Sequence, residues 1–201
     1  NAACKVKGQT PMVLGRDEAY IGVLIDDLVT KGTQEPYRMF TSRAEFRLLF
    51  NHGSAELRLK DKIAEFGLVP PDRLSRIQAK AQKVAHWIEY LEKLAIPGGI
   101  AGDVIRRNWD STPKDLPPTF LAEAAEVQAE VMYRVKYRGY LERETRNARK
   151  LHDLDSFKVP EGFDFLKAYG LRIEARQKLH TIQPKTLGQA SRISGVNPAD
   201  I

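Results

Sequence analysis

The sequence predicts a mainly α-helical protein, and two observations favour this fold class. Apolar residues recur at helical spacing along most of the 201 residues, in segments bounded by helix-capping and helix-breaking residues. Val, Ile and Thr do not gather into alternating runs between tight turns, so we do not expect a core built on a sheet. The composition, 42% hydrophobic and 29% charged, is typical of a globular protein rather than a disordered one.

Three helical segments are expected in the first third of the chain. The chain opens in a pattern typical of the last turn of a helix, which closes at Lys7. Asp17 can cap a second helix that stops at Gly32, although the apolar alternation there also fits a short strand. Ser42 and the glutamate three residues later form a capping box, which predicts a helix over residues 44–50.

The middle of the chain alternates helices with breaks. A short helix over residues 62–66 is expected to end at Gly67, and a longer one is expected over residues 73–94. Residues 96–102 are rich in glycine and residues 112–118 are rich in proline. We therefore expect a flexible break at each of these two stretches.

The last part of the chain is also predicted to be helical. Because only Gly139 interrupts the pattern over residues 119–154, we expect one helix of about nine turns there. A linker over residues 158–162 then leads to short helices over residues 172–180 and 186–193. Each end of the sequence has the pattern of an interrupted helix, which indicates that the chain is part of a longer protein.

Composition also argues against membrane and secreted classes. The longest apolar run, residues 20–25, is far too short to span a bilayer. A single cysteine, Cys4, cannot form an internal disulfide, which suits a reducing compartment. We therefore expect a cytoplasmic protein that makes no membrane contact.

The sequence does not predict a self-contained active site. It contains no G-x-G-x-x-G or Walker-type glycine loop, and its four histidines never pair at the spacing of metal ligands. Asp26 and Asp27 are adjacent carboxylates, but neighbouring side chains on a helix point about 100° apart. We therefore expect a solvated helix surface there, and we assign no catalytic, cofactor-binding or metal-binding residue.

Positive charge is concentrated in two regions of the chain. Residues 110–130 carry one basic and five acidic residues, a net charge of −4, whereas residues 131–150 carry seven basic and two acidic residues, a net charge of +5. Residues 171–195 carry five basic residues and one acidic residue, a net charge of +4. Segregation of this kind favours a partner that carries negative charge, such as a nucleic acid.

The basic half of the predicted long helix is one candidate nucleic-acid surface. A single arc of about a third of a turn contains Lys136, Tyr140, Arg143, Arg146 and Lys150. Guanidinium and ammonium groups neutralise phosphates, and an exposed tyrosine can stack on an unpaired base. The alternative is a solvated charged face, with Tyr133, Tyr137 and Tyr140 packed against neighbouring helices.

The segment 37–47 is a second candidate surface. Arg43 and Arg47 lie on one face of the predicted helix, and Arg43 is at its N-terminal end, where free amides favour an anion. The alternative is a network of arginine and glutamate side chains that ties a loop to a core. The tail, residues 170–196, has the short helices and glycine turns of helix-hairpin-helix or helix-turn-helix modules, a pattern also common in three-helix bundles.

Three segments of the chain resemble the GidA/MnmG family. They read YIGVLIDDLVTKG at 20–32 with EPYRMFTSRAEFRLL at 35–49, KYRGYLER at 136–143, and PKTLGQASRISGVNPADI at 184–201. The family is the flavoprotein subunit of the enzyme that modifies the wobble uridine of tRNA. The resemblance implies that this chain is the helical C-terminal domain of a larger FAD-dependent α/β protein.

The resemblance further implies how the whole protein acts. FAD and NADH would be bound upstream of this chain, and residues 1–15 would be the end of the FAD-binding domain. The whole enzyme would attach a (carboxymethyl)aminomethyl group at carbon-5 of the wobble uridine, with a folate one-carbon donor and flavin redox chemistry. It would act as a homodimer together with a partner GTPase, MnmE.

The resemblance also implies a division of labour along the chain. Residues 1–68 would end the FAD-binding domain and connect it to a helical domain over residues 69–157, followed by a small helical subdomain over residues 158–201. The tRNA-binding residues would be Arg38, Arg43, Arg47, Arg58, Lys136, Tyr140, Arg143, Arg146 and Lys150. The tail helices, residues 172–193, would dock the GTPase or add a further tRNA contact. The docking residues would be Lys185, Gln189 and Arg192.

Two departures from the family pattern limit this assignment. The family usually continues LRQDNADLRL after Leu49, whereas this chain continues FNHGSAELRL, so Asn51 replaces an arginine and receives no tRNA role. The stretch 95–118 has no counterpart in the family pattern and is expected to be a variable loop. Two alternatives to tRNA binding remain: a scaffold that docks the GTPase without touching tRNA, and a helix-turn-helix protein that binds duplex DNA.

Overall fold

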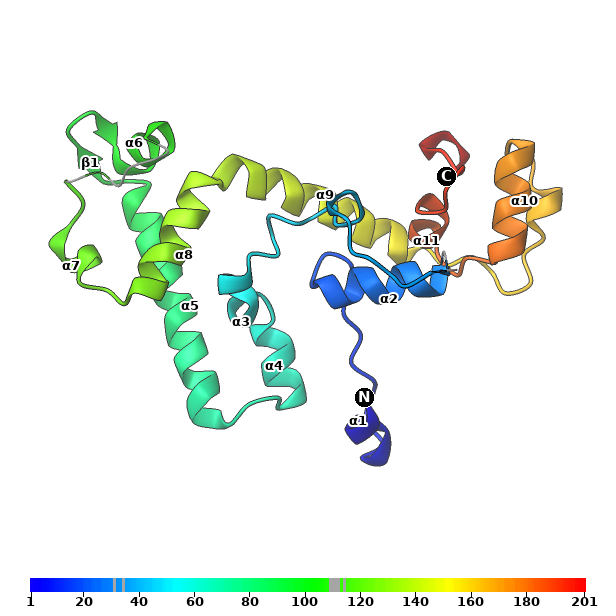
Figure 1. The fold of residues 1–201 in the computed structure, drawn as a ribbon, viewed down its shortest axis with the longest axis horizontal. Coiled ribbons are helices and arrows are strands. Elements are labelled where there is room, and N and C mark those ends of the chain that lie inside the picture. Colours follow the sequence, from blue (N-terminus) through cyan, green and yellow to red (C-terminus); the bar gives the residue numbers. More distant parts are fainter. Residues whose placement is uncertain (31, 34, 109–112, 114) are drawn as a thin grey trace. The chain divides into compact units, whose positions relative to one another are not determined.

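The computed structural model describes residues 1–30, 32–33, 35–108, 113 and 115–201 (Figure 1). Within these ranges the chain forms eleven α-helices and one short hairpin, so the predicted mainly α-helical class is confirmed. None of the helices in the described ranges is both long and apolar enough to cross a membrane.

The chain packs as two compact units, each built from two separate stretches of sequence. Unit 1 combines Asn1–Val13 with Arg47–Arg143, and unit 2 combines Leu14–Phe46 with Glu144–Ile201. The three consecutive domains predicted from the sequence divide the chain differently. Capping and breaking residues mark where helices end, but they do not reveal which distant segments pack together.

Unit 1 is built from short helices around one long pair. Its elements are α1 (Ala2–Val6), η2 (His52–Ser54), α3 (Ala55–Arg58), α4 (Lys60–Phe66), α5 (Pro71–Leu91), β1 (Ala95–Ile96), β2 (Gly99–Ile100), α6 (Ala101–Arg107), α7 (Pro118–Leu121), α8 (Ala125–Lys136) and the start of α9 (Arg138–Ser156). The predicted short helix before Gly67 and the long helix after it are confirmed. Gly67 ends α4 in the left-handed conformation, at a φ of 58°.

The core of unit 1 lies between α5 and α8, which pack against each other, with α6 packed on α8 (Figure 1). The apolar positions at helical spacing on α5 face this core, where Val84 and Leu91 are buried. Ile105 of α6, Phe120 of α7 and Val131 of α8 complete its centre, each at most 1% exposed.

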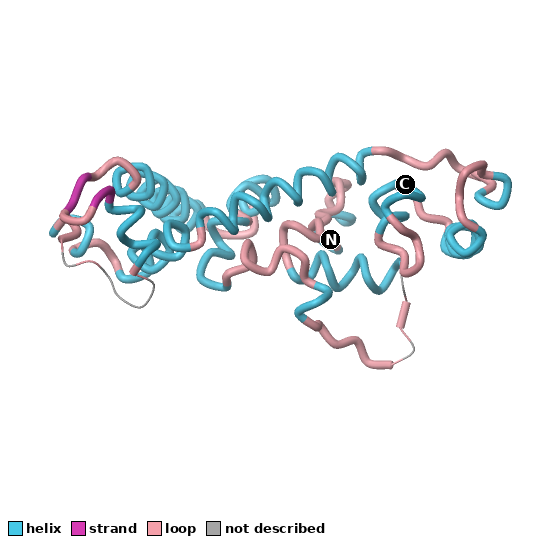
Figure 2. The backbone as a smooth tube through the Cα atoms, turned by 90° about the horizontal axis from the view of Figure 1, so that it is seen from above, coloured by secondary structure: helices cyan, strands magenta, loops and turns pink. Residues whose placement is uncertain are grey.

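The glycine-rich stretch after α5 is a hairpin, so its prediction as a flexible break is wrong. β1 and β2 pair antiparallel (Figure 2), and Gly98 and Gly99 have positive φ values of 96° and 129° at the turn. α6 follows directly, and its Ile105 is fully buried. Part of the stretch 95–118, which was expected to be a variable loop, therefore belongs to the core.

The prediction of one continuous helix over residues 119–154 is wrong, because the structure has three helices there, α7, α8 and α9. The chain turns between α7 and α8, where the side-chain amide of Gln128 donates to the carbonyls of Leu121 and Glu123. A second interruption falls at Tyr137, which caps α8 just before α9 begins. Of the break expected at residues 112–118, the described residues 113 and 115–117 form neither helix nor strand, and Pro118 begins α7. Residues 112 and 114 lie outside the described residues.

Unit 2 contains one long helix and several short elements. These are α2 (Tyr20–Thr30), η1 (Thr41–Arg43), the rest of α9, η3 (Phe165–Lys167), α10 (Ile173–Ile182), α11 (Leu187–Ser191) and η4 (Pro198–Asp200). The two predicted tail helices are confirmed as α10 and α11. They enclose a small apolar core of Phe165, Ala175, Leu179, Ala190, Ile193 and Val196.

Two expectations in unit 2 are settled by the packing. α2 is a helix, and it has apolar residues on both its buried side (Val23) and its exposed side (Ile21, Ile25), which explains why its pattern also fitted a strand. The helix predicted over residues 44–50 is absent, because the chain there forms turns. Glu45, the expected capping residue, instead binds the side chain of Arg16.

Candidate nucleic-acid interface

A pocket of about 750 Å³ opens in unit 2, in the segment that follows α2. It is lined by Gly32, Thr33, Glu35, Pro36, Tyr37, Arg38, Phe40 and Arg43. Gly32 has a φ of 63°, a left-handed conformation that turns the chain away from the end of α2. Residues 35–40 form neither helix nor strand and lead to η1, and the segment 35–43 places Tyr37, Arg38, Phe40 and Arg43 on the pocket wall.

The arginines of the pocket lie over the faces of its aromatic rings. The guanidinium carbon of Arg38 is 5.2 Å from the centroid of Phe40, and that of Arg43 is 5.1 Å from the centroid of Tyr37. Arg38 is exposed and Phe40 is 48% exposed. A guanidinium held over an aromatic face keeps hydrogen-bond donors for phosphate, and an exposed ring offers a surface on which a base can stack.

Asp27 of α2 supports this wall through a contact with Tyr37. Its carboxylate is fully buried, and its Oδ2 accepts a 2.8 Å hydrogen bond from the Tyr37 hydroxyl. Burial, together with donation to this carboxylate, raises the pKa of Tyr37. Nη1 of Arg43 lies 3.4 Å from the same oxygen, so one carboxylate holds both a ring and a guanidinium of the pocket.

Arg16 neutralises the buried carboxylates. Its Nη1 donates to Asp27 over 2.7 Å and to Asp26 over 3.0 Å, and its Nη2 donates to Glu45 over 2.8 Å and to the carbonyl of Arg43 over 3.1 Å. Burial disfavours the charged guanidinium, but the attraction of Glu45 and Asp27 outweighs it, so the pKa of Arg16 is raised. The guanidinium is therefore a permanent, buried positive charge within unit 2.

The expectation of a solvated surface at Asp26 and Asp27 is wrong. Asp27 is completely buried, and the side chain of Asp26 is 16% exposed. Sequence reasoning also missed Arg16, which has no motif around it. The available signal was a pair of carboxylates inside an apolar helical segment, because buried carboxylates require cationic partners. The alternative of an Arg–Glu network is confirmed for Glu45, with Arg16 as its partner.

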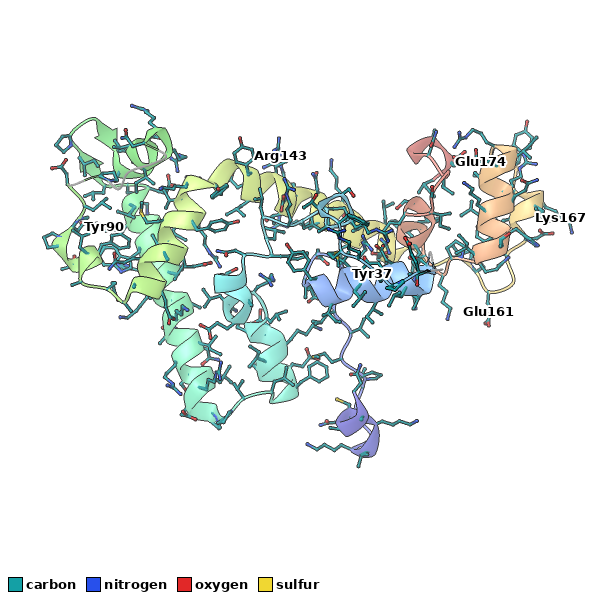
Figure 3. The ribbon with its side chains drawn as sticks, viewed as in Figure 1. Tyr37, Tyr90, Arg143, Glu161, Lys167 and Glu174 are labelled. Carbon is teal, nitrogen blue, oxygen red and sulfur yellow. The ribbon has the colours of Figure 1, made fainter. Side chains whose placement is uncertain are left out.

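The predicted basic arc is distributed along two helices. In unit 1, Arg143 lies over the ring of Tyr140 at 5.3 Å, and Tyr140 is 50% exposed (Figure 3). Lys136 is partly buried near the end of α8. Within unit 2, α9 carries Arg146 and Lys150, and both are exposed.

The alternative of packed tyrosines holds for one end of the aromatic row. The hydroxyl of Tyr133 donates to the carbonyl of Leu48 over 2.6 Å, and its ring lies 4.8 Å from that of Tyr137. These two residues therefore pack within unit 1. Tyr140 is the member of the row that is exposed enough to stack on a base.

Arg47 and Arg58, both in unit 1, have different surroundings. Arg47 is exposed at the start of the second stretch of unit 1. Nη1 of Arg58 donates to the carbonyl of Leu49 over 2.8 Å, and its guanidinium lies 5.2 Å from the ring centroid of Phe50. Arg58 therefore organises its own loop, whereas Arg47 is accessible to a partner.

The three residues predicted to dock the GTPase also differ in their exposure and contacts. Lys185 is exposed, and its backbone N–H donates to the side chain of Gln189 over 2.8 Å. The guanidinium of Arg192 binds Asp26 and Asp155, and its side chain is 9% exposed. Lys185 thus remains available to a partner, whereas Arg192 has a place in the ion-pair network of unit 2.

No group of three or more potential metal ligands occurs in the part of the chain that the structure describes. Of the histidines, His86 stacks on Tyr90 at 6.2 Å and packs edge-on against Trp87 at 5.4 Å. The conspicuous chemistry of the described residues is therefore arginine, aromatic rings and buried carboxylates. Such a surface suits the binding of an anionic polymer.

The chain is similar to known proteins along its whole length. Residues 147–201 match the family model of the tRNA modifying enzyme MnmG/GidA C-terminal helical bundle. Two proteins called "tRNA uridine 5-carboxymethylaminomethyl modification enzyme MnmG" align with 100% of this chain. The one from Alkaliphilus oremlandii is 44% identical, with 35% of its length covered, and the one from Protochlamydia amoebophila is 45% identical, with 33% covered.

A solved structure gives the same result. GidA from Aquifex aeolicus (form II crystal) aligns with all of this chain and 34% of that protein, at 38% identity and a TM-score of 0.77. The chain thus spans about a third of the length of the relatives that it matches. By sequence and by fold, it belongs to the GidA/MnmG family, in which it corresponds to the helical C-terminal part of a larger protein.

Proposed function

We propose that this chain is the tRNA-binding part of an enzyme that modifies tRNA uridine. The observation that carries the proposal is the pocket of unit 2, in which Arg38 and Arg43 lie over the rings of Phe40 and Tyr37. Stacked arginines and an exposed ring form a site for phosphate and an unpaired base. The names of the relatives, tRNA uridine 5-carboxymethylaminomethyl modification enzymes, support tRNA as the polymer.

The exposed cations of α9 are further candidate contacts for the same polymer. Arg143, Arg146 and Lys150 are exposed, and each phosphate that they neutralise would release counterions. Together with Arg38, Arg43 and Arg47 they would position the tRNA, while the chemistry takes place elsewhere in the protein. The whole protein would install the (carboxymethyl)aminomethyl group at carbon-5 of the wobble uridine.

FAD and NADH would be held by parts of the protein outside this chain. The closest approach to a phosphate loop is the pair Gly98 and Gly99, which belongs to the β1–β2 turn and does not follow a buried strand of a larger sheet. This turn is therefore not the glycine loop that holds a dinucleotide. In the proposal, the whole enzyme is a cytoplasmic homodimer that works with the GTPase MnmE, for which Lys185 is an exposed candidate contact.

The test is tRNA binding by the full-length protein across a range of salt concentrations. Arg38→Met removes an exposed guanidinium from the pocket, so it should weaken binding and lower the salt slope by about one phosphate contact. Lys178→Met is the matched control, because it removes one positive charge from the exposed face of α10 in the same unit. We expect the control to bind like the unchanged protein.

Charge reversal at Arg143, Arg146 and Lys150 tests the α9 surface in the same assay. It should weaken tRNA binding strongly and flatten the salt slope further. If these variants and Arg38→Met all retained the affinity and slope of the unchanged protein, tRNA binding by this chain would be wrong. Capture of the GTPase without RNA, by a protein that does not bind tRNA, would then favour the scaffold.

A further inference from the structure

Asp26 joins two parts of unit 2 through one carboxylate. Its Oδ2 accepts from Nη1 of Arg16 and from Nε of Arg192, each over 3.0 Å, and its Oδ1 accepts from Nη2 of Arg192 over 3.1 Å. None of these three residues lines the pocket. Asp26 is therefore a carboxylate shared by two arginines that lie in distant segments of the sequence.

The Arg192 side of this junction leads to the tail. Its guanidinium also donates to both carboxylate oxygens of Asp155, each over 3.2 Å, near the end of α9. Asp155 accepts in turn from the hydroxyl of Thr186 over 3.1 Å, and this hydroxyl caps α11 by accepting from the backbone N–H of Gln189. The position of α11 and the position of Asp26 are thus fixed together.

The Arg16 side of the junction leads to the pocket. The same guanidinium that binds Asp26 holds the backbone of Arg43 through its carbonyl, over 3.1 Å. It also pairs with Asp27, the carboxylate that accepts from Tyr37. A shift of Arg16 would therefore move the Tyr37 ring and the Arg43 guanidinium of the pocket wall, even if no residue that lines the pocket were substituted.

We propose that Asp26 and Arg192 are positioning residues for RNA binding: they hold Arg16, and through it the pocket wall, in the geometry that accepts the polymer. The proposal rests on the proposed function of the pocket. In this proposal the tail helix α11 and the pocket are coupled through Asp26, so that a change at α11 alters RNA affinity. Neither Asp26 nor Arg192 contacts the RNA.

The sign of the effect distinguishes positioning from simple electrostatics. Asp26→Asn removes a negative charge, so electrostatics alone would strengthen the binding of a polyanion. Positioning predicts the opposite, a loss of affinity of about fivefold, since the amide cannot hold two arginines as the carboxylate does. The control is Glu174→Gln, which removes an exposed carboxylate of α10 in the same unit and should not weaken binding.

The experiment measures the affinity of the full-length protein for an unmodified tRNA transcript at several salt concentrations, with thermal melting beside it. Arg192→Met is the second variant, compared with Lys178→Met, in case Asp26→Asn folds poorly. Both positioning variants should bind about fivefold more weakly with an unchanged salt slope, because no phosphate contact is lost.

Three results would separate the possible failures. Unchanged or stronger binding by Asp26→Asn and unchanged binding by Arg192→Met, while Arg38→Met is weakened, would overturn the positioning proposal and leave the pocket intact. A lower salt slope in Arg192→Met would also overturn it, because Arg192 would then contact phosphate directly. If Arg38→Met also bound normally, the proposed function of the pocket would fail with it.

Discussion

Unit 1 and unit 2 bury different chemistry. Unit 1 is held by apolar side chains between α5, α6 and α8, where Leu91 and Ile105 are fully buried. Unit 2 has a small apolar core around α10 and α11, but its irregular segment 35–46 is held on α2 by the charged side chains of Arg16 and Asp27. The regular helices are packed by apolar contacts, whereas the irregular loop is fixed by directional ion pairs.

This difference has a physical reason. Apolar contacts are non-directional, so they stabilise helices that present a regular stripe but do not define the path of a loop. A guanidinium has five donors in a fixed plane, so Arg16 specifies where Asp27, Glu45 and the carbonyl of Arg43 must lie. Specificity of this kind suits a loop whose arginines and rings must be presented together.

The largest expected effect is the loss of Arg16. Arg16→Met leaves Asp27 buried without its 2.7 Å partner, and breaking a buried ion pair costs about 3–5 kcal/mol. Hydrogen exchange of the α2 amides in the full-length protein measures this cost. The double variant Arg16→Met with Asp27→Leu should recover part of the loss, because an apolar replacement of the pair removes the unpaired charge. A double loss equal to the sum of the two single losses would contradict the network account.

A smaller or comparable loss of stability is expected when a side chain in the core of unit 1 is truncated. Leu91→Ala should destabilise unit 1 by about 2–5 kcal/mol, because Leu91 is fully buried. Denaturant unfolding at low and high salt measures it, and Glu89→Ala on the exposed face of α5 is the control. The loss should be the same at both salt concentrations, since no charge is involved. A loss that changed strongly with salt would mean that charged side chains contribute to the stability of this core.

The smallest effect on stability is expected from Glu92, whose carboxylate forms ion pairs with two arginines in unit 1. Burial raises its pKa, but Arg106 at 2.6 Å and Arg138 at 2.7 Å outweigh burial, so the pKa of Glu92 is lowered. A lowered folded-state pKa stabilises the fold at pH values above the ordinary carboxyl range. This contribution is lost as the pH falls through the folded-state pKa.

The matching measurement is the stability of Glu92→Gln at several pH values. The variant should be less stable than the unchanged protein at neutral pH, and its stability should fall less steeply in acid. Parallel pH curves for the two proteins would show that the two arginines do not stabilise the Glu92 carboxylate.

Sequence reasoning located most of the helices because their signals are local. Gly67 ends α4 and Pro71 begins α5 through conformations that each residue favours by itself. The capping box at Ser42 failed, because Glu45 gains more from Arg16 than from a local amide. A partner 29 positions away leaves no periodic pattern in the sequence.

The candidate site was predicted only in part, because some of its residues lie in one local segment and others pair across long stretches of sequence. Arg43 was predicted from its position in the segment 37–47, and Arg38 from the family resemblance. The carboxylates below them were misinterpreted, because adjacent aspartates on a helix are usually solvated. Arg192 was assigned to a partner, since its pairing with Asp26 joins positions 166 residues apart.

The most direct test of the account is a double-mutant cycle on tRNA affinity in the full-length protein, with Asp26→Asn and Arg43→Met. If Asp26 acts through the pocket wall, its substitution should weaken binding in the unchanged protein and have much less effect once Arg43 is gone. If the two substitutions change the binding free energy additively, Asp26 and the pocket are independent, and the central claim is contradicted.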